Sequence, residues 1–282
     1  MVNWGNGLPL EGTMTIPFLE VAMPLCRRRL IEGTTMRLFA LVLALSLGGC
    51  AATPLPQVPP AGMPAAVPAP KIAEGDSWTY RVHDGFTRLP REDQRFVVDR
   101  VGGGRIEVAG AVERGDGAQV YDLEWNWLRR AATDLQTFVY SPAYPAFAFP
   151  LAPGKSWHAK VTATDPRDGR RFPVWIDGAV LGWERVKVPA GEFDALKIER
   201  VVSIGYWEYS ARGESIIREY EWYSPSVKWA VKREASASYL SYVGSIGTEP
   251  GFVRVGDGDQ SGAPKFVRDD WLIYELASFS VR

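Results

Sequence analysis

The stretch SWTYRVH (residues 77–83) alternates apolar and polar side chains, with Trp78, Tyr80 and Val82 at every second position. This period of two is typical of a strand that buries one face. The same alternation recurs at residues 105–108, 157–161, 172–176, 180–188, 193–204, 215–223, 227–234 and 271–281. The sequence therefore predicts a chain that is built from many half-buried strands.

Turn signals separate these segments, among them the glycines at 102–104, Asp168-Gly169 and Ser224-Pro225. No stretch after residue 70 keeps a helical period, and residues 128–135 could form at most one or two helical turns. Strands at hairpin spacing without crossover helices favour antiparallel pairing. We therefore predict an all-β fold, with one antiparallel β domain over residues 71–282. It would be a sandwich, a curled sheet or half-barrel around a cavity, or a closed barrel.

The N-terminal region differs in kind from this domain. Residues 38–47 (LFALVLALSL) form a run of ten residues without a charge, and arginines at 27–29 and 37 precede it. The run is too short to span a membrane and has the length of a signal-peptide core. We interpret residues 36–49 as a signal peptide, and residues 1–35 as either a mis-assigned start or an extended leader.

The signal peptide ends in LGGC (residues 47–50), which resembles the bacterial lipobox. The resemblance implies cleavage before Cys50, attachment of diacylglycerol to its thiol, and acylation of the new N-terminus by a fatty acid such as palmitate. Two or more acyl chains anchor a protein stably to a membrane. Ala51 stands where lipoproteins of the inner membrane typically carry Asp, which points to the periplasmic face of the outer membrane. The alternative is a plain secretory signal in which Cys50 is incidental.

Residues 50–70 would then hold the lipidated cysteine and a linker, because seven of the residues from 53 to 70 are proline. Such a run is either a semi-rigid polyproline stalk or a disordered tether. The other cysteine, Cys26, lies upstream of the cut, so the mature chain could form no internal disulfide.

Composition and motifs exclude several classes of function. The net charge of -1 gives no reason to expect a nucleic-acid partner. His83 and His158 fall on the polar faces of their predicted strands, so we expect neither a metal site nor a cofactor. The Gly/Asp loop at 257–262 matches half of a calcium loop, but Arg268 stands where the closing Glu should be. Glu219 and Glu221 alternate with aromatic residues, as on the wet face of a strand, so a paired-carboxylate hydrolase is a minor alternative and we predict no enzyme.

Aromatic residues are the unusual feature. Residues 138–151 (FVYSPAYPAFAFPL) carry three prolines, which predict an apolar loop or edge rather than a central strand. That loop would either cap the core or cover an apolar ligand. The candidate binding residues are aromatic throughout: Trp125, Trp127, Tyr140, Tyr144, Phe147, Phe149, Trp207 and Trp222.

Four segments carry a family resemblance: YSPAYPAFAFPLAPGKSW (140–157), GWERVKVPAGEFDALKIER (182–200), EWYSPSVK (221–228) and VKRE (231–234). They look like an uncharacterised family of bacterial exported, β-rich proteins. The resemblance implies no catalytic residues. It suggests a shape similar to the half-barrels of the periplasmic lipoprotein carriers and of the outer-membrane lipoprotein receptor LolB, which is an analogy of fold alone.

The leading hypothesis is a non-enzymatic outer-membrane lipoprotein that binds a lipid or other apolar envelope component in a groove lined by inward Trp and Tyr. The alternative is a glycan- or protein-binding scaffold of the envelope, for which aromatic side chains should lie exposed in a row on one face.

Overall fold

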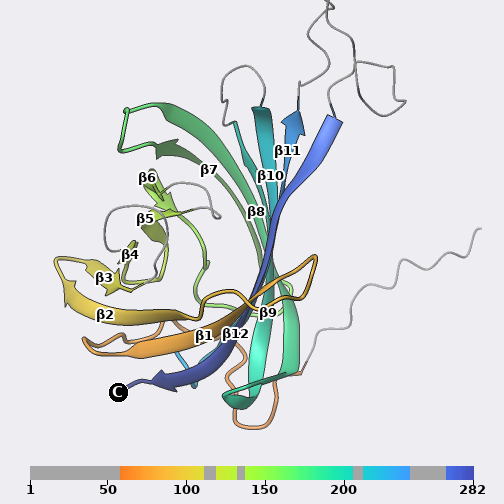
Figure 1. Cartoon of the computed structure of the whole chain (residues 1–282). Helices are drawn as coiled ribbons and strands as arrows, with labels where there is room; N and C mark the ends of the chain where they lie inside the picture. The colour runs from red at the N-terminus through yellow and green to blue at the C-terminus, as the bar shows by residue number, and fades with distance from the viewer. Residues whose placement is uncertain (1–57, 111–118, 132–136, 206–211, 242–264) are drawn as a thin grey trace, which may run out of the picture. The chain divides into compact units, whose positions relative to one another are not determined.

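The computed structural model describes residues 58–110, 119–131, 137–205, 212–241 and 265–282, which form twelve strands (Figure 1). The strands are β1 (Ser77–Asp84), β2 (Gln94–Gly102), β3 (Arg105–Ala109), β4 (Gln119–Asp122), β5 (Trp127–Ala131), β6 (Thr137–Tyr144), β7 (Ser156–Thr164), β8 (Arg171–Val188), β9 (Gly191–Ile204), β10 (Arg212–Ser224), β11 (Trp229–Ser241) and β12 (Lys265–Ser280). These residues include no helix, which confirms the predicted all-β class. Accordingly, the described part of the chain has no helix long and apolar enough to cross a membrane.

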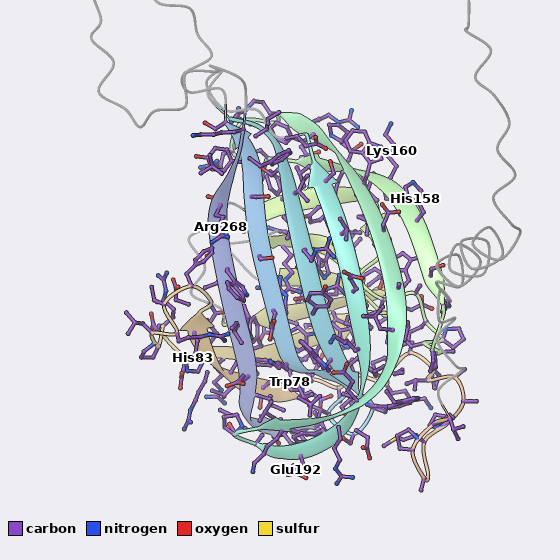
Figure 2. All side chains as sticks on the ribbon, turned by 90° about the vertical axis from the view of Figure 1, so that its right-hand side faces the viewer. Trp78, His83, His158, Lys160, Glu192 and Arg268 are labelled. Atoms are coloured by element: carbon purple, nitrogen blue, oxygen red, sulfur yellow. The ribbon has the colours of Figure 1, made fainter. Side chains whose placement is uncertain are left out.

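The twelve strands form one closed antiparallel barrel. Each strand pairs with its neighbours in the chain, and β1 pairs with β12 to close the sheet, starting at Ser77 opposite Ser280. Among the shapes that the sequence left open, the chain therefore adopts the closed barrel. Strands β8 to β12 are long and make one tall wall, whereas β3 to β5 are short (Figures 1 and 2).

The opening stretch 77–83 forms β1 and faces inward as predicted, with Trp78, Tyr80 and Val82 buried. The Trp78 indole nitrogen donates to the carbonyl of Val227 at 2.9 Å, and the Tyr80 hydroxyl donates to the carbonyl of Ala230 at 2.7 Å. These bonds cross the interior rather than follow the sheet. They satisfy the polar atoms of two large aromatic side chains that the core buries.

The structure differs from the prediction between residues 94 and 144. Strands β2, β4, β5 and β6 were not predicted, and β5 occupies much of the segment for which helical turns were allowed. The segment 138–151 begins as a strand, because β6 runs to Tyr144. Pro142 is tolerated since the pairing of β6 with β7 ends at Ser141, opposite Thr162, so the missing N–H breaks no ladder bond.

Part of the proline-rich segment lies against the barrel. Val67 is buried and forms a two-way backbone bridge with Leu151, with N–O distances of 2.7 and 2.8 Å. Met63 and Ile72 also pack against the core. The sequence did not predict this contact, because the whole proline-rich segment has the composition of a linker that makes no contact with the domain.

Gly178 in β8 is required by its neighbour across the sheet. The ring of Trp157 in β7 lies over it, and a Cβ atom at this position would stand 2.1 Å from the ring. The indole nitrogen of Trp157 also donates to the carbonyl of Pro145 at 3.0 Å, which limits how far the ring can move.

We predict that Gly178→Ala lowers the free energy of unfolding by about 1–3 kcal/mol, because the added methyl group overpacks the contact with Trp157. Urea unfolding followed by circular dichroism measures this. Gly102→Ala is the matched control, since a Cβ at Gly102 meets no atom within 4 Å. Equal stability of the two variants would contradict the prediction.

Candidate functional site

A network of four charged side chains lies inside the barrel. Arg200 of β9, Glu219 and Glu221 of β10, and Arg233 of β11 are all buried, with exposed fractions of 0–8%. The sheet register aligns them, because Arg200 is opposite Glu219 and Glu221 is opposite Arg233. Neighbouring inward positions of three adjacent strands therefore carry opposite charges.

Arg200 is the centre of this network. Its Nε donates to Glu219 Oε2 at 2.9 Å, and its Nη2 donates to Glu221 Oε2 at 2.5 Å. Its Nη1 donates to the carbonyl of Ala146 at 2.8 Å, in the segment after β6. Arg233 completes the network through Nη2, which lies 2.7 Å from Glu219 Oε1. The two carboxylates are thus matched by two guanidinium groups.

The prediction that Glu219 and Glu221 lie on the wet face of their strand is wrong. The period of two was correct, but its phase was reversed, because the buried face of β10 is the charged one. Trp222 consequently lies on the outer wall. Its indole nitrogen donates to Glu184 at 2.7 Å, and its ring lies between the ammonium groups of Lys197 and Lys232, at 5.0 and 4.9 Å.

The network keeps Glu219 ionised. Burial alone would raise the pKa of this carboxyl, but the charges of Arg200 and Arg233 outweigh that effect and lower the pKa from 4.5 to about 2. Glu199 of β9, a neighbouring carboxylate, faces outward and pairs with Arg218. Both carboxylates of the network therefore lie in ion pairs with arginine side chains.

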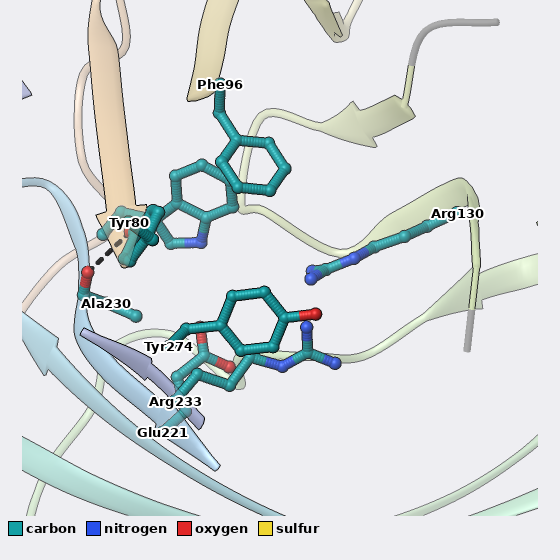
Figure 3. A pocket seen from close by; sticks show the side chains of 8 residues that line it. Tyr80, Phe96, Arg130, Glu221, Ala230, Arg233 and Tyr274 are labelled. Atoms are coloured by element: carbon teal, nitrogen blue, oxygen red, sulfur yellow. Dashed lines mark hydrogen bonds between the residues drawn. The ribbon is translucent and has the colours of Figure 1, made fainter. Parts of the chain in front are cut away.

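A small cavity lies beside the network. Its enclosed volume is about 20 Å³, and about 290 Å³ is empty when the space at its open mouth is included. Aromatic rings and three charged side chains line it: Tyr80, Phe96, Arg130, Glu221, Trp229, Ala230, Arg233 and Tyr274 (Figure 3). Burial, followed by the charge of Glu221, raises the pKa of the Tyr80 phenol well above its ordinary value, so it stays protonated. The cavity therefore combines an apolar aromatic surface with fixed charges.

Arg130 is placed in this cavity by the aromatic residues of its own and the neighbouring strand. Its Cζ lies 4.4 Å from the centre of the Trp127 ring and 5.9 Å from that of Tyr121. Stacking on these rings holds the guanidinium away from solvent, and 4% of the residue is exposed.

The predicted aromatic residues form three groups rather than one groove. Trp125 stacks on Trp229 at 4.7 Å, Trp127 stacks on Tyr144 at 4.2 Å with Tyr140 beside it, and Phe147 stacks on Phe149 at 5.6 Å. All of these except the half-buried Phe149 are buried in the core. Trp207 and Cys50 lie outside the described residues.

None of the eight predicted residues lines the cavity, although Trp127 and Trp125 support its walls. Its aromatic lining comes from β1, β2, β11 and β12. Tyr80 and Trp229 could have been found, because both fall on apolar strand positions of the sequence. Arg130 carried no such signal, since the segment around it was not recognised as a strand.

The two histidines lie away from the cavity. His83 is half-buried, and His158 is exposed on the outer wall, where its Nδ1 is 2.6 Å from Asp177 Oδ1 (Figure 2). Within the described ranges, no three His, Cys, Asp or Glu side chains are grouped in a way that could hold a metal ion.

Fold and site together define the class of protein: a closed antiparallel β-barrel with an ion-paired, aromatic interior. No known family model matches the chain, and no curated protein matches its sequence. Similar solved structures include a protein provisionally assigned as a lipoprotein from Parabacteroides distasonis (15% identity, 76% of this chain and 99% of that one, TM-score 0.41). Another is an exported protein with a YmcC-like fold from Bacteroides fragilis (16% identity, 76% and 99%, TM-score 0.41).

The hypothetical lipoprotein YmcC from Escherichia coli is also similar, at 10% identity over 56% of this chain and 75% of that one, with a TM-score of 0.37. These neighbours are thus described as lipoproteins or exported proteins. Likenesses of this size do not define a family for the chain.

We predict that Glu219→Gln lowers the free energy of unfolding by about 3–5 kcal/mol at pH 7, because Arg233 loses its buried ion-pair partner and Arg200 keeps only Glu221. Glu107→Gln is the control, since its pair with Arg100 lies on the outer wall and contributes at most about 1 kcal/mol. Chemical denaturation at pH 7 measures both.

The same variant tests the depressed pKa. The stabilisation by ionised Glu219 is complete above pH 4.5 and is lost as the pH falls toward 2. The native chain should therefore lose stability over this range more steeply than Glu219→Gln does. Parallel pH profiles of the two proteins would show that Glu219 is not the titrating group.

Proposed function

We propose that the chain is an exported protein of the bacterial envelope, anchored through lipid on Cys50 at the periplasmic face of the outer membrane. Its barrel binds a lipid or other apolar envelope component and catalyses no reaction. One observation carries the binding proposal: four aromatic rings converge on a part-open cavity inside the barrel.

The rings of this cavity are held in place before any ligand arrives. Trp229 contacts Phe96 edge-to-face at 5.3 Å, and Tyr80 contacts Phe96 at 5.7 Å and Tyr274 at 6.5 Å. Tyr80 already donates its hydroxyl hydrogen to Ala230, so its ring rather than its hydroxyl is available to a ligand. An apolar group that enters at the open mouth of this cavity leaves water and gains dispersion contacts with the rings.

The ion-pair network supports a binding role rather than a catalytic one. Each interior carboxylate accepts a hydrogen bond from an arginine, and the low pKa of Glu219 removes it as a proton donor near neutral pH. These groups fix the wall on which the cavity rests.

The alternative, a glycan- or protein-binding scaffold, requires open aromatic faces on the outer wall. Several outer rings lie beneath lysine side chains instead: Lys160 is 5.3 Å from the Trp175 ring, and Lys197 is 5.4 Å from the Tyr220 ring. We therefore place this alternative second.

The neutral dye N-phenyl-1-naphthylamine should bind the purified full chain saturably, with its fluorescence increasing on entry to the cavity. Phe96→Trp should weaken binding at least about tenfold, because the larger ring fills the cavity. Phe279→Trp is the control, because Phe279 is 38% exposed and does not line the cavity. Weak, non-saturable binding by the unmodified chain would refute an apolar site, whereas lipid recovered by mass spectrometry from the purified protein would identify the natural class.

Cys50→Ser should abolish acylation and move the protein from the membrane to the soluble envelope fraction, because the lipid anchor needs a thiol. Cys26→Ser should change neither property, since Cys26 lies before the proposed cleavage site. Mass spectrometry of the N-terminal peptide and cell fractionation measure both effects. An unmodified Cys50 at the N-terminus of a secreted protein would contradict the anchor.

A further inference from the structure

Arg130 differs from every other buried charged residue that the structure describes. Seven charged side chains are buried there, and six of them form ion pairs. Within the interior network, Arg200 and Arg233 balance Glu219 and Glu221. Arg130 takes part in no ion pair among the described residues, so it adds one uncompensated positive charge to the barrel interior.

The position of Arg130 suggests a use for this charge. Its guanidinium is directed into the cavity, on the side where Tyr274 and Arg233 lie (Figure 3). Its Nε is buried without a hydrogen-bond partner. Removing an unpaired cation from water is expensive, so a buried guanidinium normally has an anion beside it. Here the rings of Trp127 and Tyr121 support the cation, and the cavity leaves its polar edge open.

The surrounding groups limit which anion fits. Glu221 lines the same cavity, and its negative charge disfavours a doubly charged group such as a phosphate monoester. A guanidinium binds a carboxylate through two parallel N–H···O bonds, and one carboxylate would neutralise the single excess charge. The aromatic lining then accommodates an apolar remainder of the same molecule.

We propose that the ligand of the cavity carries one carboxylate, bound by Arg130, on an apolar body, as a fatty acid does. This inference rests on the proposed function, because it names the chemical class of the ligand for the same site. Arg130 provides selectivity for the acid, and the rings of Phe96 and Trp229 bind the hydrocarbon.

Octanoate and 1-octanol separate the two contributions, because they differ in the head group and share their chain. Isothermal titration of the full chain at pH 7.5 should give at least about tenfold tighter binding of octanoate, the effect of a charge-assisted hydrogen bond. Arg130→Gln should remove this preference and leave octanol binding unchanged. Arg100→Gln is the control, since Arg100 is an exposed arginine of the outer wall.

The outcomes distinguish this inference from the proposed function. Equal affinity of the unmodified chain for octanoate and octanol overturns the carboxylate proposal and leaves apolar binding standing. Failure of both compounds and of the neutral dye to bind overturns both proposals. Without ligand, Arg130→Gln should unfold at the same temperature as the unmodified chain or higher. A loss as large as that of Glu219→Gln would show that Arg130 serves the fold, which also overturns the inference.

Discussion

The pairing of Arg200 with both Glu219 and Glu221 is the constraint on which the barrel interior depends. It joins β9 to β10, and through the carbonyl of Ala146 it reaches the segment after β6. A shift of β10 by one residue would turn both carboxylates outward and leave Arg200 buried without a partner. The ion pairs therefore determine which face of β10 is interior, and they place Tyr220 and Trp222 on the outer wall.

Much of the fold was predictable from alternation, and the reason it failed on β10 is physical. In β1 the apolar face is unambiguous, so Trp78 and Tyr80 were assigned correctly. In β10 Tyr220 and Trp222 stand on one face and Glu219 and Glu221 on the other, and the contrast between these four residues favours the wrong assignment. The complementary charges of Arg200 and Arg233 would have corrected it, but that comparison needs the register of three strands, which single-strand patterns do not contain.

The site was less predictable than the fold. Its lining comes from six strands that are distant in the sequence, from Tyr80 in β1 to Tyr274 in β12. Aromatic residues could be selected by type, but most of those chosen, such as Trp125 and Tyr144, serve the core. In the sequence Arg130 looks like an exposed arginine, and only the position of β5 in the barrel shows that its side chain points inward. The cavity forms only when strands far apart in the sequence pair to close the barrel, so local sequence patterns do not predict it.

The pairing of β1 with β12 also sets the order in which the barrel can be completed. Ser77 of β1 pairs with Ser280 of β12. One edge of β1 therefore stays unpaired until β12, the last strand of the barrel, has been made. Until then β1 and the growing end of the sheet both expose unpaired backbone groups, which are sites for mispairing with other chains. A chain that ended before β12 would thus form an open sheet with two unpaired edges, even though every residue of the ion-pair network would be present.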